Sequence, residues 1–161
     1  MELISYKDFD SWARSCVTIA EHHLTQDGYV APLLHMMGQD EDKLMNFAGS
    51  PQEDVPFCEI VGTIVQQEKA LAYVFINEAW YYEAENIKET EEQLRNNTLI
   101  RAKNHPDRKE CIMVSAEHPD GISIYVRKFH REGKEIIFDG ATEKLPWNAH
   151  SGFGNLLRPQ G

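Results

Sequence analysis

The stretch that decides the fold is ECIMVSAEHPDGISIYVRKFHREGKEIIF, residues 110–138. Apolar residues alternate with other residues at 112–116 and again at 122–126, and this period of two is typical of strands with one buried face. His118-Pro119-Asp120-Gly121 separates the two runs and predicts a tight turn, because proline fixes φ and aspartate bonds the nearby backbone. A second turn at 131–134 leads to a strand at 136–138. The stretch therefore predicts an antiparallel meander.

Residues 70–82 (ALAYVFINEAWYY) contain the longest strand pattern upstream of the meander. They are aromatic, β-branched and apolar at successive positions, which indicates a central strand covered on both faces. Two shorter strands are expected at 29–37 and 43–47, joined by an acidic turn at 40–42.

Two helices are predicted in the first half of the chain. Ser5 can cap a helix that ends at Asp27-Gly28. Its apolar residues follow helical spacing: Tyr6, Phe9, Ala13, Cys16, Val17, Ala20 and Leu24. The second helix opens at Ser50-Pro51, with Pro56 as an alternative start, and continues to about Glu68. The acidic run 83–92 must be solvated, and we expect it to start a short exposed helix through Leu94.

These elements predict an α+β fold in the order α-β-β-α-β-β-β-β, with two main helices and an antiparallel sheet of five to six strands. The order is similar to profilin-like and PAS-like arrangements, an analogy that carries no function. The 161 residues are typical of one domain. We expect a single domain at 1–146 and an irregular tail at 147–161.

The chain is acidic, with a formal net charge of −10. Residues 1–100 hold 18 acids and 6 bases, and the other 61 hold 8 acids and 10 bases. Phosphate contacts need positive surface, so we expect no nucleic-acid partner and interpret the basic stretch 101–134 as a solvated face of mixed charge.

The three cysteines, Cys16, Cys58 and Cys111, imply no disulfide framework because their number is odd and no Cys-x-x-Cys pair exists. The N-terminus lacks a signal-peptide pattern, and the longest apolar run is too short to span a bilayer. We therefore expect a cytoplasmic protein without membrane association.

Glu78-Ala79-Trp80 ends the predicted central strand, and His105-Pro106-Asp107-Arg108 enters the next one. The pair resembles a pattern in a family of small prokaryotic proteins of uncharacterised function, in which a Glu-Ala-Trp strand end precedes a His-Pro-Asp-Arg strand entry. The resemblance covers about residues 70–130 and implies no activity.

His105-Pro106-Asp107 also matches the signature tripeptide of J-domains, but the strand pattern that follows contradicts the helix such a domain needs. Glu78, His105 and Asp107 are the candidate catalytic residues. A carboxylate among apolar neighbours either pairs with a cation or has its pKa raised, as a general acid or base requires. The alternative for Glu78 is a wet strand end, or a structural ion pair with Arg101, Arg108 or Arg127. No His-x-His or His-Glu-x-x-His spacing exists, so we expect no metal and no cofactor.

Trp80, Tyr82 and Trp147 are the candidate binding residues, because exposed aromatics of this kind anchor interfaces. Closure of an open end of the core is the equal alternative. Two hypotheses follow: a non-catalytic binding or protein-interaction module that self-associates or binds a protein partner, or a small metal-dependent or hydrolase-like enzyme using Glu78 with His105 and Asp107.

Overall fold

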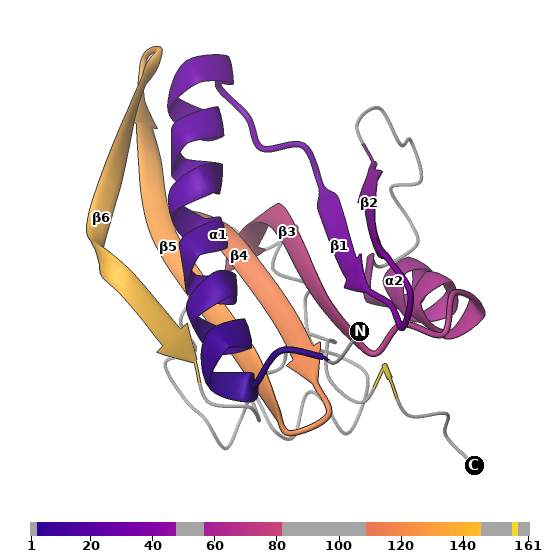
Figure 1. The fold of residues 1–161 in the computed structure, drawn as a ribbon. Helices are drawn as coiled ribbons and strands as arrows, with labels where there is room; N and C mark the ends of the chain where they lie inside the picture. Colours follow the sequence, from indigo (N-terminus) through magenta and orange to yellow (C-terminus); the bar gives the residue numbers. More distant parts are fainter. Residues whose placement is uncertain (1–2, 48–56, 82–108, 146–155, 158–161) are drawn as a thin grey trace, which may run out of the picture.

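The computed structural model describes residues 3–47, 57–81, 109–145 and 156–157 (Figure 1). The helices are α1 (Tyr6–Asp27) and α2 (Phe57–Gln67). The strands are β1 (Leu33–Met37), β2 (Asp42–Asn46), β3 (Ala72–Tyr81), β4 (Lys109–His118), β5 (Gly121–Glu132) and β6 (Glu135–Leu145). The predicted α+β class and the order α-β-β-α-β-β-β-β are confirmed.

The described strands form one antiparallel sheet with the spatial order β2-β1-β3-β4-β5-β6. β1 begins later than the predicted residue 29, because the Val30 N–H donates to a side chain and not to the ladder. β6 extends well beyond the predicted 136–138. Most of its later residues are exposed, so no apolar alternation marks them in the sequence.

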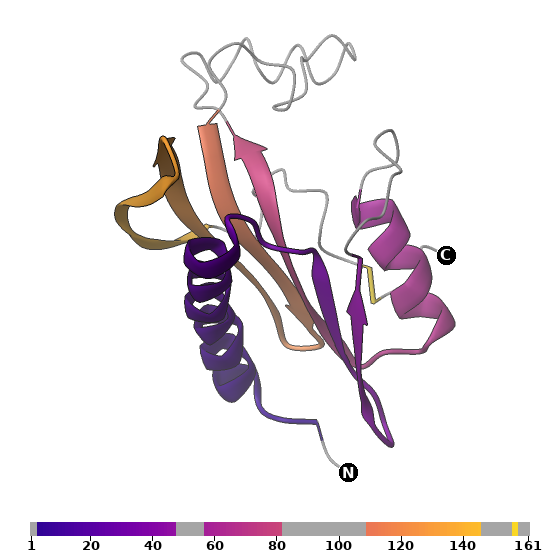
Figure 2. The same ribbon diagram turned by 90° about the horizontal axis from the view of Figure 1, so that it is seen from above.

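The two helices lie on opposite faces of the sheet (Figure 2). β3 explains this arrangement, because its side chains alternate between two separate apolar clusters. Val74 and Ile76 pack in the cluster of α1, whereas Tyr73 and Phe75 pack in the cluster of α2. The predicted central strand with two covered faces is therefore confirmed.

Local signals determine both ends of α1. The Ser5 hydroxyl accepts a hydrogen bond from the Asp8 N–H at 3.2 Å, and Gly28 closes the helix at φ 80°. The Gly28 N–H donates to the Leu24 carbonyl at 2.9 Å. The predicted stripe is the buried face, with Phe9, Ala13, Cys16, Val17, Ala20 and Leu24 all in the core. Neither α1 nor α2, the described helices, has the apolar length needed to cross a membrane.

The predicted turn at His118-Pro119-Asp120-Gly121 connects β4 to β5. His118 is buried, and its Nδ1 accepts the Asp120 N–H at 3.0 Å. Its Nε2 donates to the Ile4 carbonyl at 2.8 Å. This His-Pro-Asp tripeptide thus stabilises a turn and attaches the segment before α1.

Part of the predicted tail is docked on the sheet. Leu156 and Leu157 pack in the cluster of α2, and their N–H groups donate to the buried Glu117 carboxylate at 2.8 and 3.3 Å. Tyr73 donates to the same carboxylate at 3.3 Å. A buried carboxylate needs such donors, so Glu117 and this part of the tail stabilise each other.

Gly28→Ala should lower the free energy of unfolding by about 1 kcal/mol, because alanine is strained at positive φ. An added Cβ would meet no atom within 4 Å, so the loss is a backbone effect. Gly28→Asn should lose less, since asparagine tolerates this conformation. Urea denaturation measures both, and equal stability of Gly28→Ala and the wild type would contradict the assignment.

Candidate functional site

Glu78 lies near the end of β3 on the face that α1 covers. In the sheet register, Trp80 lies opposite Glu110, and Glu110 lies opposite Phe129. Period-two alternation then places Arg131 on the same face, two residues beyond Phe129. Glu78, Glu110 and Arg131 therefore form a diagonal across three neighbouring strands.

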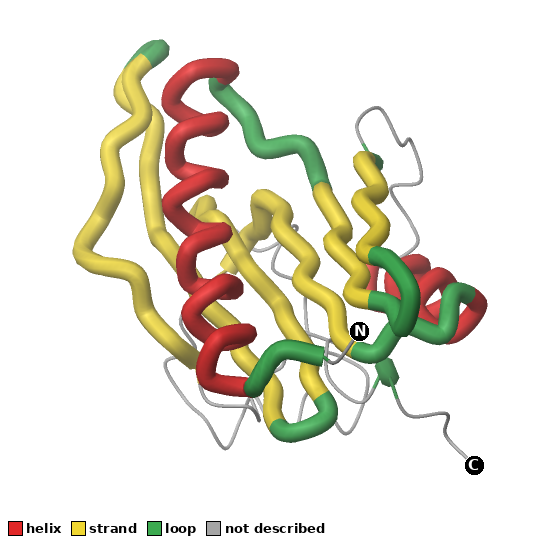
Figure 3. The backbone as a smooth tube through the Cα atoms, in the orientation of Figure 1, coloured by secondary structure: helices red, strands yellow, loops and turns green. Residues whose placement is uncertain are grey.

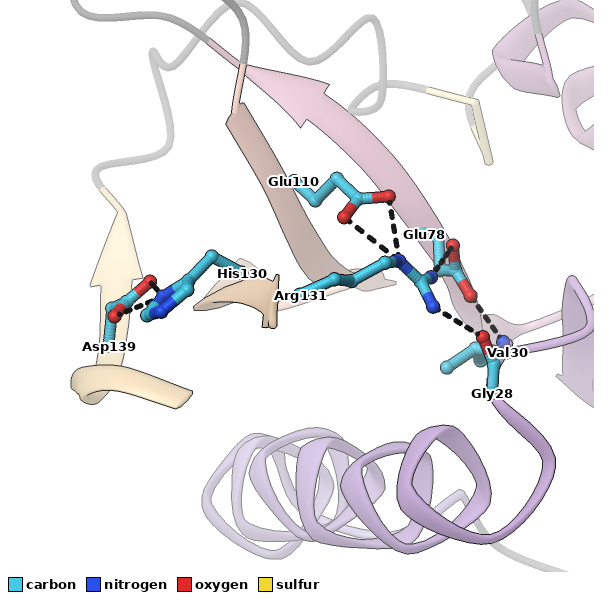
Figure 4. A network of polar contacts seen from close by, with 7 residues as sticks. All are labelled: Gly28, Val30, Glu78, Glu110, His130, Arg131 and Asp139. Carbon is cyan, nitrogen blue, oxygen red and sulfur yellow. Dashed lines mark hydrogen bonds and ion pairs between the residues drawn. The ribbon is translucent and has the colours of Figure 1, made fainter. Parts of the chain in front are cut away.

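Arg131 holds four chain segments together (Figure 4). Its Nε donates to Glu110 at 3.1 Å, its Nη2 lies 3.6 Å from Glu78 Oε2, and its Nη1 donates to the Gly28 carbonyl at 2.9 Å. Glu78 Oε1 also accepts the Val30 N–H. The charge cluster thus attaches the loop after α1 to the end of the sheet.

Glu78 is an ion-pair residue in this structure. Its side chain is 27% exposed. Burial raises the pKa of Glu78, the Val30 N–H and Arg131 oppose the rise, and Glu110 adds to it. The pairing cation is Arg131. Of the three predicted arginines, Arg127 lies 3.6 Å from Glu21, and Arg101 and Arg108 lie outside the described residues. Arg127 lies opposite Ile112, which lies opposite Glu78. Ile112 therefore separates Arg127 from Glu78 in their common cross-strand row.

Four other predicted site residues, His105, Asp107, Tyr82 and Trp147, lie outside the described residues. Convergence of Glu78 with His105 and Asp107 therefore stays a prediction. Trp80 is described and is 42% exposed. The described residues contain no group of three His, Cys, Asp or Glu side chains that could hold a metal ion.

The cysteines are free thiols, and two of them are core residues. Cys16 and Cys111 are buried, and burial raises the pKa of each to about 12. A thiol of that kind is protonated at neutral pH and is a poor nucleophile. Cys58 is half-buried, and burial raises its pKa as well.

A hollow of about 840 Å³ lies at the end of the sheet near Trp80, Lys109, Lys128 and His130. His130 lies 2.9 Å from Asp139 (Figure 4), and hydrogen bonds with Asp139 and Glu132 raise the pKa of His130. Residues 82–108 connect β3 to β4, two of the strands that border this hollow, and lie outside the described residues, so we assign no ligand to it.

A second hollow, the α1–β1 cleft, lies between the C-terminal half of α1 and the beginning of β1. Its volume is about 260 Å³. The described residues that line it are Ile19, Ala20, His23, Asp27, Tyr29, Val30, Ala31, Leu33, Asn46 and Ile76. The cleft therefore has apolar walls with a carboxylate, an imidazole and an amide among them. The loop 28–32, green in Figure 3, borders it.

Three large exposed apolar side chains lie at or near the α1–β1 cleft. Ile19 is 40% exposed and Tyr29 is 57% exposed, and both line it. Leu44, 70% exposed, lies in β2 two residues before Asn46 and so on the same face. α1 lies over β3 to β6 (Figure 2), which leaves this face of β2 largely exposed. The sequence analysis missed this site, because no local pattern tells which strands a helix covers.

A second polar cluster holds the N-terminal half of α1. Asp10 Oδ1 accepts hydrogen bonds from Ser123, from Tyr125 at 2.9 Å and from Lys144 at 2.9 Å. Tyr6 shares a hydrogen bond with Ser123 at 2.9 Å. Burial opposes the ionisation of Asp10, but these donors outweigh it and hold the pKa of Asp10 below its ordinary value.

Comparison with family models, with curated proteins and with solved structures gives no match for this chain.

Glu78→Gln should gain stability relative to the wild type as pH rises from about 4 to 7. The folded-state pKa of Glu78 is raised, so the unfolded chain loses this proton first and the ionised glutamate destabilises the native state. Urea denaturation across this range tests it, with the exposed Glu135→Gln as the control. A wild type that gains relative to Glu78→Gln would show that attraction to Arg131 outweighs desolvation.

Asp10→Asn should lose stability relative to the wild type as pH rises, the opposite of Glu78→Gln. The lowered pKa means that the ionised carboxylate stabilises the native state above about pH 4, and this stabilisation is lost as pH falls through the folded-state pKa. At pH 7 the variant should lose about 2 kcal/mol, since hydrogen bonds to a charged group are weakened. The exposed Asp8→Asn should lose no more than about 0.5 kcal/mol. Equal losses in the two variants would refute the role of the cluster.

Proposed function

We propose that this chain is a non-catalytic protein-interaction module whose partner binds at the cleft surface, defined as the α1–β1 cleft with Ile19, Tyr29 and Leu44 around it. One observation carries the proposal. The described part of the chain exposes six large apolar side chains, and these are three of them.

Exposed apolar groups that lie together are typical of interaction sites, whereas single ones are ordinary. The cleft adds a recess among them with apolar walls. Interfaces of this kind take most of their affinity from an anchor side chain that fills a pocket. A volume of about 260 Å³ lies at the lower limit of small-molecule sites and suits one large side chain.

The use of Glu78 supports a non-catalytic role. Its carboxylate accepts a backbone N–H and pairs with Arg131, and such contacts attach a loop to the sheet without requiring a substrate. The proposal includes a cytoplasmic location, which the three free cysteines support.

Selection of random peptides displayed on phage tests this function. Peptides enriched on the wild-type protein should lose binding to an Ile19→Ser/Leu44→Ser double variant, because it removes apolar area from the cleft surface. They should keep binding to Trp80→Ser, a change at an aromatic residue that is 42% exposed and does not line the cleft.

Thermal unfolding of both variants establishes that each is folded before binding is compared. Peptides lost on Trp80→Ser but kept on the double variant would move the interaction to the Trp80 end of the sheet. Failure to enrich any peptide that distinguishes the variants would end the proposal.

A further inference from the structure

We propose, on the basis of the proposed function, that the partner inserts a basic side chain into the α1–β1 cleft. Its apolar stem contacts the cleft walls, and its cationic head lies at Asp27. The partner is thus a protein segment that presents lysine or arginine beside apolar residues.

Charge at the mouth of the cleft favours a cation. Asp27 is the last residue of α1, its side chain is 57% exposed, and the last turn contains no basic residue. The C-terminal end of a helix carries partial negative charge, so the carboxylate and the helix end reinforce each other. His23 Nδ1 lies 3.7 Å from Asp27 Oδ2 on the helix surface.

The neighbouring Glu78–Glu110–Arg131 cluster does not make the surroundings of the cleft positive. Glu78 and Glu110 contribute two carboxylates beside the loop that borders the cleft, and Arg131 contributes one guanidinium, which also binds the Gly28 carbonyl. With Asp27, the cleft and its border hold three carboxylates and one guanidinium. The His23 imidazole and the Tyr29 phenol also line the cleft.

The shape of the cleft suits a long basic side chain better than a compact ion. Ala20, Val30 and Ile76 are buried residues of the lining. Lysine and arginine bury apolar stems along such surfaces while the head stays at the wet end. Tyr29 also lines the cleft, and a tyrosine ring attracts a cation placed over its face.

Net charge argues against a second copy as the occupant. Every residue that lines the cleft lies in the first 100 residues, which hold 18 acids and 6 bases. Two such surfaces repel each other, whereas a basic segment is attracted and steered toward the cleft.

The composition of the peptides selected above and their response to Asp27→Asn test this inference. Enriched peptides should share a lysine or arginine next to an apolar residue. Replacement of that residue by norleucine or citrulline, its neutral analogue, should weaken binding about fivefold. Asp27→Asn should weaken binding of the parent peptide by a similar factor and leave binding of the neutral analogue unchanged.

Asp40→Asn is the matched control, since it removes the same charge from an exposed turn at the far end of β1. It should change binding little. Asp27→Asn should keep or raise the thermal midpoint, because it removes a negative charge from a helix C-terminus. A loss of binding in this variant is then not a loss of folding.

Three outcomes would overturn the inference. Enriched peptides that lose binding to Ile19→Ser/Leu44→Ser but carry no basic residue would support the proposed function and contradict the inserted basic side chain. A wild-type dimer in sedimentation velocity that Leu44→Ser abolishes would show a second copy at this surface. A small compound retained in native mass spectrometry by the wild type, and lost from Ile19→Ser/Leu44→Ser, would show a small-molecule site.

Discussion

The burial of β3 on both faces is the constraint on which the rest of this structure depends. Both faces of this strand carry apolar side chains. Val74 and Ile76 pack in the cluster of α1, and Tyr73 and Phe75 pack in the cluster of α2. A sheet covered on one side would expose one of these pairs to water. Each face therefore needs its own helix, and the three-layer arrangement follows from this strand.

The α1–β1 cleft is a consequence of the same arrangement. Six strands about 4.8 Å apart span roughly 24 Å, whereas one helix is about 10 Å in diameter. α1 lies over β3 to β6, so the opposite edge of the sheet extends beyond it. β2 then presents Leu44 without a covering layer among the described residues, whereas Leu33 and Met37 of β1 still pack in the cluster of α1.

Two polar clusters hold α1 in this position, one at each end. Asp10 binds side chains of β5 and β6 near the helix start, and the Glu78–Glu110–Arg131 cluster binds the loop after the helix end. The pKa shifts of the carboxylates in the two clusters have opposite directions. Hydrogen bonds dominate at Asp10 and lower its pKa, while desolvation dominates at Glu78 and raises its pKa. Together they position the wall of the cleft that α1 supplies.

The sequence by itself determined the elements and the core faces of this protein. The α1 stripe from Phe9 to Leu24, the two-faced pattern of β3 and the turn at residues 118–121 are local signals, and each produced the predicted element. The contacts between elements were decided by tertiary structure. Arg131 pairs with Glu78 along a diagonal of the sheet. Arg127 lies in the same cross-strand row as Glu78 but pairs with Glu21 of α1. Ile19, Tyr29 and Leu44 come from α1, the loop after it and β2. They lie on one side of the sheet, at or near one cleft, because α1 lies across only part of the sheet. Local periodicity specifies which side of an element is apolar, but the position of a helix across a sheet depends on all the packing contacts at once.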